Sequence, residues 1–138
     1  MKIAEVSKRY GITADTLRYY ERVGLMPRIA RTASGIRDYS ETDCQRIQFI
    51  KCMRGAGMPI DPLITYMHLF DEGSHTVPER IELLKEQREL MQGRIDEMQA
   101  GLDRLDYKIA HYEEIERAAA GARAEQAADA GGTSYRPR

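Results

Sequence analysis

The chain has 138 residues, enough for about one domain, and its 42% hydrophobic and 31% charged residues are typical of a globular protein. This composition excludes a wholly disordered chain, and the lack of an apolar run of ~18 residues excludes a membrane-spanning protein. The amino terminus is polar and has no apolar core of an export signal, so we expect a cytoplasmic protein.

Charge is unevenly distributed along the chain. Residues 1–60 hold eleven Lys and Arg against six Asp and Glu, whereas residues 61–138 hold ten against sixteen. The formal net charge of -1 therefore combines a basic first half with an acidic second half. A basic half favours contact with a polyanion, although a solvated basic surface gives the same pattern.

Two short helices are predicted first. Residues 2–10 carry apolar side chains at helical spacing, and Gly11 ends that segment. Thr13 is a preferred N-cap for a second helix, which we expect to extend to about Val23. Because a Gly-containing turn separates the two, this pattern predicts a helix-turn-helix.

A basic hairpin and two more helices are predicted next. Residues 25–39 lack helical periodicity and contain a Ser-Gly turn, which predicts a β-hairpin, or wing. Residues 40–43 fit a capping box and begin a third helix that extends to about Ala56. A fourth helix begins near Pro59 and ends near Leu69.

After a polar linker at 71–76, residues 77–117 carry the clearest periodic pattern in the chain. Apolar residues alternate at steps of three and four over more than four heptads and form a stripe, here called the seam. Arg88 is the single polar residue of this seam. A helix of roughly 40 residues is about 60 Å long. It cannot bury this seam against the head, which consists of the preceding elements of the same chain. The pattern therefore predicts a coiled-coil homodimer. The expected dimerisation residues are Ile81, Leu84, Met91, Ile95, Met98, Leu102, Leu105, Ile109 and Tyr112.

Residues 118–138 contain mainly Ala, Gly and polar side chains, and none of Ile, Leu, Val, Met or Phe. Such a segment has too few apolar groups to form a core of its own. We therefore predict a frayed helix end followed by a disordered tail.

The second helix and the hairpin hold the candidate DNA-binding residues. Arginine offers a fixed set of donors to phosphate or guanine, and a tyrosine hydroxyl binds phosphate. An isolated helix of this kind also fits a solvated surface with a core tyrosine, but an adjoining hairpin with the same chemistry favours nucleic-acid binding. The candidates are Thr13, Thr16, Arg18, Tyr19, Tyr20, Arg22, Arg28, Arg31, Arg37 and Tyr39.

The order of these motifs resembles the MerR family of bacterial transcription regulators. The similarity covers about residues 1–117, and its matching segments are Ile3–Ser7, Thr16–Glu21, Gly24–Leu25 and Gly35–Tyr39, followed by a helix, a linker and one long helix. This resemblance implies a mainly α fold, with a winged helix-turn-helix head followed by a long helix that forms an antiparallel coiled-coil homodimer.

The resemblance also implies a mechanism. Members of the family bind palindromic promoter DNA and distort an overlong spacer so that RNA polymerase engages both of its elements. Arg18, Tyr19, Arg37 and Tyr39 would contact the DNA backbone. Glu21 would orient a neighbouring arginine instead of touching DNA.

This chain departs from the family pattern at two positions. Ile36 stands where many members carry a wing tyrosine, which removes one possible phosphate donor. Pro59 stands where a Ser or Thr N-cap is usual, so we expect a less tightly fixed junction between the third and fourth helices.

The sequence disfavours two kinds of signal for such a regulator, metal ions and ligands bound by a separate domain. Metal-sensing members of the family carry cysteines at the start and just beyond the end of the long helix, whereas residues 71–138 here contain none, and His75 and His111 lie at its opposite ends. The resemblance therefore disfavours soft-metal sensing, and we expect neither a metal nor a cofactor. The tail is too short for a ligand-binding domain.

The segment 49–54 resembles the NmlR or AdhR subgroup, whose members respond to aldehydes or related electrophiles through a cysteine at the position of Cys52. The alternative is a small buried core residue, which is the commonest role of a free cysteine. Cys44 has no matching role, and its spacing from Cys52 on one helix excludes a disulfide between them.

Other classes of function remain as alternatives. One is a MerR-type regulator with a different signal or none, and another is a coiled-coil adaptor or antitoxin-like module that binds a protein. An enzyme is disfavoured because the sequence has no Gly-rich phosphate loop and no His and Cys arrangement resembling a nucleophile with its base.

Overall fold

The structure is a computed structural model that describes residues 1–135, with side chains for residues 1–129. The described residues form two compact units, the first of residues 1–92 and the second from residue 93 onward. Within the described part of the chain, no helix is long and apolar enough to cross a membrane.

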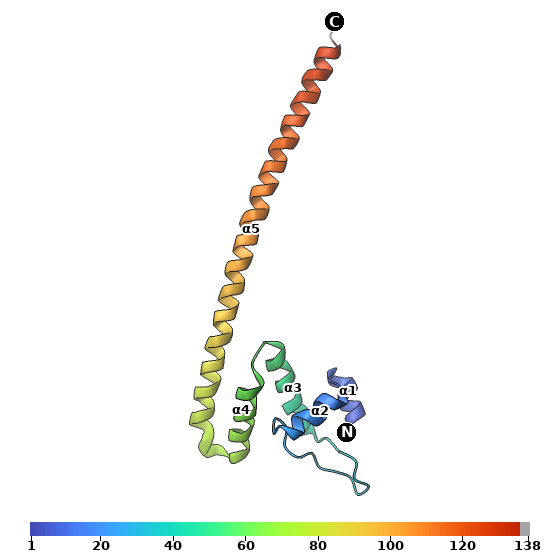
Figure 1. Cartoon of the computed structure of the whole chain (residues 1–138), viewed down its shortest axis with the longest axis vertical. Coiled ribbons are helices and arrows are strands. Elements are labelled where there is room, and N and C mark those ends of the chain that lie inside the picture. The colour runs from blue at the N-terminus through green and yellow to red at the C-terminus, as the bar shows by residue number, and fades with distance from the viewer. Residues whose placement is uncertain (136–138) are drawn as a thin grey trace. The chain divides into compact units, whose positions relative to one another are not determined.

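The predicted helix-turn-helix is confirmed. Helix α1 spans Ile3–Tyr10 and helix α2 spans Ala14–Arg22 (Figure 1). Gly11 ends α1 with a φ of 66°, a left-handed conformation that favours glycine, and its N–H donates to the carbonyl of Ser7. Thr13 is the N-cap of α2, because its hydroxyl oxygen accepts a hydrogen bond of 3.1 Å from the backbone N–H of Thr16.

The hairpin after α2 is less regular than predicted. A turn occurs at Gly35, but the two sides pair only through an isolated antiparallel bridge between Arg31 and Arg37, and residues 1–135 contain no β-strand. Thr32 explains part of the difference, since its hydroxyl oxygen accepts the N–H of Ile36 at 3.2 Å. Local bonds from Thr and Ser side chains compete with a regular ladder.

Helices α3, Glu41–Gly55, and α4, Ile60–Glu72, follow the wing. The predicted capping box is confirmed, because the Ser40 hydroxyl accepts from the N–H of Asp43 and the Asp43 carboxylate accepts from the N–H of Ser40. Pro59 is the N-cap of α4 and provides no side-chain hydrogen bond there.

The predicted linker at 71–76 is structured. Helix α4 continues to Glu72, beyond the expected end near Leu69, and the 3-10 helix η1 then spans Ser74–Thr76. Thr76 is buried, and its hydroxyl lies within hydrogen-bond distance of the carbonyl oxygens of Leu69 and Gly73. Because one side chain joins the end of α4 to the start of the next helix, the connection has a defined path.

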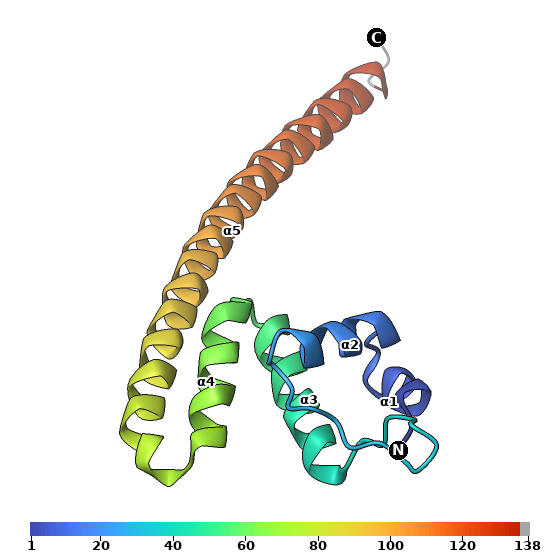
Figure 2. The same cartoon turned by 60° about the horizontal axis from the view of Figure 1, so that its bottom comes forward.

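The core of the first unit joins α1, α2, the wing, α3 and α4 (Figure 2). Side chains of Leu83 and Met91, from the first turns of the last helix, pack against this core, and Gln87 between them is buried. The first part of that helix therefore belongs to the head. The buried core residues are Val6, Leu17, Tyr20, Leu25, Met26, Ile29, Tyr39, Cys44, Ile47, Ile50, Met58, Leu63 and Met67.

The last helix, α5, spans Val77–Tyr135. Its start agrees with the predicted long helix, but it continues through 118–135, where the sequence predicted fraying and disorder. The Ala, Arg, Glu and Gln residues of this segment have high helix propensity, which explains the continuation without a packed core. The last three residues of the predicted tail, 136–138, lie outside the described residues.

The capping box gives a stability prediction. Ser40→Ala removes one reciprocal hydrogen bond at the start of α3, and we expect the free energy of unfolding to fall by about 1 kcal/mol, measured by urea denaturation. The neighbouring Thr42→Ala, at an exposed position of the same turn, is the control and should have a smaller effect. Equal losses for the two variants would contradict the assigned role of Ser40.

Candidate nucleic-acid interface

Polar and cationic side chains gather on the exposed side of α2. Thr13 and Thr16 lie at its N-terminal end, joined by a hydrogen bond of 2.8 Å between their hydroxyls. One turn further along, the Arg18 guanidinium pairs with exposed Asp15 at 2.8 Å. An exposed pair such as this contributes little to stability, so Arg18 can exchange its partner for a phosphate at small cost.

The aromatic candidates on α2 face different environments. Tyr19 is exposed, and the guanidinium of Arg22 lies 5.4 Å from the centre of its ring. Tyr20 is buried in the core. Tyr19 and Arg22 therefore lie at the surface, where they can contact DNA. The buried position of Tyr20 does not fit its predicted contact with DNA.

Tyr39 is a second correction. Its side chain is only 3% exposed, and its hydroxyl is buried without a hydrogen-bond partner. Burial raises the pKa of Tyr39 above the ordinary value of a phenol, so the ring packs as a neutral group. A phosphate has no access to this hydroxyl, and the residue packs in the core instead of contacting DNA.

An ion pair joins the wing to α2. The Arg37 Nε donates to the Glu21 carboxylate at 2.8 Å, and the two side chains are 22% and 15% exposed. This geometry confirms the expectation that Glu21 orients a neighbouring arginine. Arg18, Arg22, Glu21 and Arg37 line one open pocket of about 310 Å³, so the helix and the wing contribute cations to the same surface.

The remaining wing arginines are exposed. The Arg31 guanidinium donates to the carbonyl of Gly35 at 2.7 Å and thereby holds the turn of the wing, whereas Arg28 lies closer to α2 in the chain. Ile36, which departs from the family pattern, is 45% exposed at the wing. The wing therefore presents cations together with one apolar side chain.

The two cysteines occupy opposite environments. Both are free thiols, but Cys44 is buried in the core and Cys52 is exposed on α3. Within this chain, Cys52 therefore does not have the role of a buried packing residue that remained as the alternative. A small electrophile can reach its sulfur.

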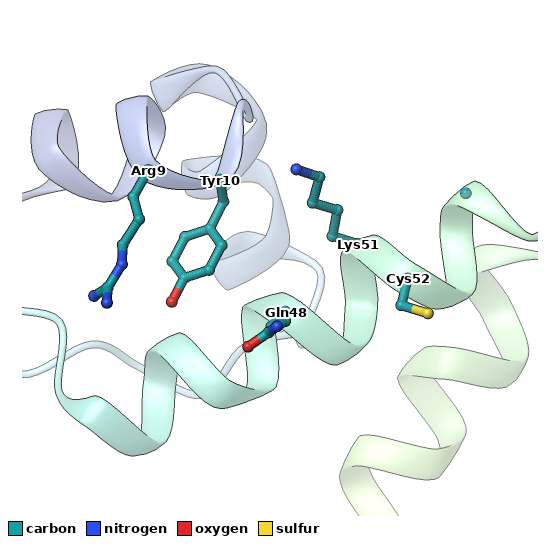
Figure 3. A pocket seen from close by; sticks show the side chains of 6 residues that line it. Arg9, Tyr10, Gln48, Lys51 and Cys52 are labelled. Atoms are coloured by element: carbon teal, nitrogen blue, oxygen red, sulfur yellow. The ribbon is translucent and has the colours of Figure 1, made fainter.

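Cys52 lies beside an open pocket of about 620 Å³ between α1 and α3 (Figure 3). Arg9, Tyr10, Gln48 and Lys51 line the same pocket. The picture shows the Cys52 sulfur pointing away from Arg9 and Tyr10. Sequence reasoning missed this pocket because α1 and α3 approach each other only through the tertiary fold.

The predicted dimerisation residues behave differently in the two units. In the first unit, Ile81 and Leu84 are exposed, but Met91 packs against the core of its own head. Met91 therefore contacts the head of its own chain, and its predicted place in the seam stays a prediction. In the second unit, the following seam residues are between 53% and 67% exposed: Ile95, Met98, Leu102, Leu105, Ile109 and Tyr112.

Metal ligands do not gather in the described residues, where no group of three or more His, Cys, Asp or Glu side chains could hold an ion. His75 is exposed at η1, and His111 stacks on Tyr107 in the second unit, with ring centres 6.3 Å apart.

Comparison with known proteins identifies the family of the chain. Residues 1–69 match the family described as MerR HTH family regulatory protein, and residues 44–107 match the family described as MerR, DNA binding. The chain belongs to the MerR family. It is a DNA-binding transcriptional regulator, and the similar proteins described below are also named as regulators, not enzymes.

Two relatives show the range of the family. The HTH-type transcriptional regulator AdhR of Bacillus subtilis is 56% identical over 89 residues, which cover 64% of this chain and 64% of AdhR. The HTH-type transcriptional regulator ZntR of Escherichia coli K12 is 34% identical over 109 residues, which cover 76% of this chain and 77% of ZntR. The match therefore spans just under two thirds of the length of AdhR.

Two solved structures have the same fold. A MerR family transcriptional regulator from Listeria monocytogenes has a TM-score of 0.87 at 45% identity, covering 94% of this chain and 98% of its own. HiNmlR, a MerR family regulator that lacks the sensor domain, was solved bound to promoter DNA; its TM-score is 0.73 at 30% identity, covering 82% of this chain and 90% of its own.

The exposed arginine of α2 gives a prediction for DNA binding. If Arg18 contacts a phosphate, Arg18→Ala should weaken binding to specific and non-specific duplexes alike and lower the slope of log affinity against log salt by about 1. Arg123→Ala is the control, because Arg123 is an exposed arginine of the second unit. A changed base preference with an unaltered salt slope would place Arg18 on a base edge instead.

Proposed function

We propose that the protein is a homodimer that binds a palindromic promoter element and distorts it, and that Cys52 couples this activity to aldehydes or related electrophiles. The observation that carries the proposal is the joint surface of α2 and the wing, where Arg37 is fixed by Glu21 beside Arg18. A surface built from two elements can contact several phosphates of the DNA backbone. It binds mainly through shape and phosphate position.

The exposed seam of α5 supports the homodimer. Large apolar side chains at heptad spacing are rarely left in water, and those of the second unit are more than half exposed. A second copy of the same seam provides a matching surface of knobs and holes. The antiparallel arrangement is taken from the resemblance to the MerR family, and it gives the dimer two heads for the two halves of a palindrome.

Promoter distortion follows from joining two heads through a stiff element. Each head fixes its half-site by phosphate contacts, so a half-site spacing that differs from that of relaxed DNA must be accommodated by bending or untwisting the duplex. Smooth bending of a site costs on the order of 1 to 6 kcal/mol, which additional phosphate contacts can offset. RNA polymerase engaged at the same promoter is the partner in this proposal, and the cytoplasm is the location.

Aldehyde sensing by Cys52 is supported by its exposure and by the similarity to AdhR. The thiolate sulfur adds to the carbonyl carbon of the aldehyde, the π electrons of the carbonyl move to its oxygen, and that oxygen takes up the proton released by the thiol. The product is a hemithioacetal, formed without an oxidant. It adds volume and a hydroxyl on α3, and packed helices respond to added volume by small discrete shifts.

A specific substitution tests the sensor. Cys52→Ala should retain DNA binding and lose the transcriptional response to formaldehyde or methylglyoxal, because the nucleophile is absent. Cys44→Ala is the matched control and should retain both properties, since the buried Cys44 thiol has little access to the reagent.

Two measurements check this expectation. A reporter gene measures the response, and mass spectrometry of aldehyde-treated protein locates the adduct. A full response of Cys52→Ala, or an adduct found only at other residues, would assign the signal to another site or to another inducer.

The seam gives a second test. Replacing Leu102 and Leu105 together by Asp should yield monomers that lose palindromic DNA binding, because the dimer interface would then bury four carboxylates without partners. Ala119→Asp and Ala120→Asp, beyond the heptad seam, form the control. If the wild-type protein sediments as a monomer at micromolar concentration, the proposed assembly is contradicted.

A further inference from the structure

The open pocket between α1 and α3 has an unbalanced charge. It is lined by Arg9 and Lys51, together with the polar side chains of Tyr10 and Gln48, and by no carboxylate. Among the described residues neither cation forms an ion pair. Figure 3 shows Arg9 and Tyr10 extending from α1 toward α3, and Lys51 extending from α3 toward α1. The positive charge of such a groove favours the binding of an anion.

The position of the groove indicates which anion it meets. The Lys51 ammonium lies 3.9 Å from the point that a Cβ would occupy at Gly11, so it is next to the turn that leads into α2. Thr13 caps that helix two residues later. The groove is therefore at the N-terminal end of the helix that reads DNA in the proposed function, where the helix dipole also favours negative charge.

The spacing along α2 strengthens this reading. Arg18, Arg22 and Arg37 cluster toward the C-terminal part of α2, whereas the groove adjoins its N-terminal end. Nine helical residues extend about 13.5 Å, which is close to the ~12 Å width of a major groove in B-form DNA. A helix of this length with cations near both ends can meet the phosphates of both strands.

We propose that Arg9 and Lys51 form a second phosphate-binding site, on the backbone opposite to the one held by the wing and the C-terminal end of α2. The ligand is a DNA phosphate diester, with the Gln48 amide as a neutral donor. This inference rests on the proposed function, because it requires that α2 enter the major groove.

The test uses the full-length protein and a mixed-sequence DNA duplex, for which no operator is needed. The variants are Arg9→Gln, Lys51→Gln and the double variant, and the affinity of each is measured between about 50 and 200 mM salt. Each lost phosphate contact should lower the salt slope by about 0.9, and the double variant by about 1.8. At the low-salt end a single loss then removes an additional factor of about 3.5 relative to the high-salt end.

Two controls separate charge from folding. Lys51→Arg keeps the charge and should keep the wild-type slope, and Lys85→Gln removes an exposed lysine of α5 beside acidic residues and should leave the slope unchanged. Thermal melting followed by circular dichroism verifies that each variant is folded.

The outcomes distinguish this inference from the proposed function. Wild-type slopes for Arg9→Gln and Lys51→Gln, with intact wild-type binding, would overturn the second phosphate site and leave DNA binding in place. If the two variants keep wild-type slopes but no longer activate transcription by purified RNA polymerase, the groove binds an acidic protein surface. That result would also overturn the second phosphate site. A wild-type protein without salt-dependent duplex binding would overturn both.

Discussion

The ion pair between Glu21 and Arg37 connects α2 and the wing, the two elements of the proposed DNA-binding surface. The wing has no strand within the described residues, and its two sides are joined by a single bridge, whose backbone bonds run from Thr32 to Ile36 and from Asp38 to Ala30. The Glu21 carboxylate on α2 holds the Arg37 side chain at 2.8 Å in a largely shielded position. Since shielding from water strengthens such a pair, one carboxylate sets where the wing presents its cation.

The first part of the long helix packs against the head, whereas the rest of its seam is exposed. The core of the first unit includes the first turns of α5 through Leu83 and Met91, so the start of the helix is fixed to the head. Further along, the side chains at heptad spacing lie in solvent within a single chain. In the proposed function, a second copy covers this surface, and the dimer acts on a two-fold symmetric site.

In the proposed function, the cysteine that senses the signal lies close to a residue that contacts DNA. Cys52 and Lys51 are neighbours on α3, and the Lys51 ammonium reaches the turn before α2. In the proposed mechanism, an adduct on the thiol therefore has a short physical path to the reading helix. It needs no separate ligand domain.

The features that sequence reasoning predicted correctly are local. Thr13 and Ser40 cap their helices through bonds to residues three positions away, so the spacing of side chains along the chain contains the necessary information. The pairing of Glu21 with an arginine was also expected, on the basis of family resemblance. The helical continuation beyond residue 117 was missed because burial was given more weight than the high propensity of its Ala-rich sequence.

The features that were missed depend on tertiary contacts. Tyr20 and Tyr39 were predicted at the DNA surface but pack in the core, and nothing in their residue type separates the two roles. The burial of Gln87 and the pocket beside Arg9 arise where distant helices approach. Periodicity along one helix identifies which residues share a face, but the neighbour that covers the face is set by the whole fold.

A double-mutant cycle on Glu21 and Arg37 tests the central claim most directly. DNA affinity is measured for the wild type, Glu21→Gln, Arg37→Ala and the double variant. If Glu21 acts by holding Arg37, Glu21→Gln should weaken binding although it removes a negative charge near DNA, and it should have almost no further effect in the Arg37→Ala background. An equal effect of Glu21→Gln in both backgrounds, or tighter binding by the single variant, would contradict the account.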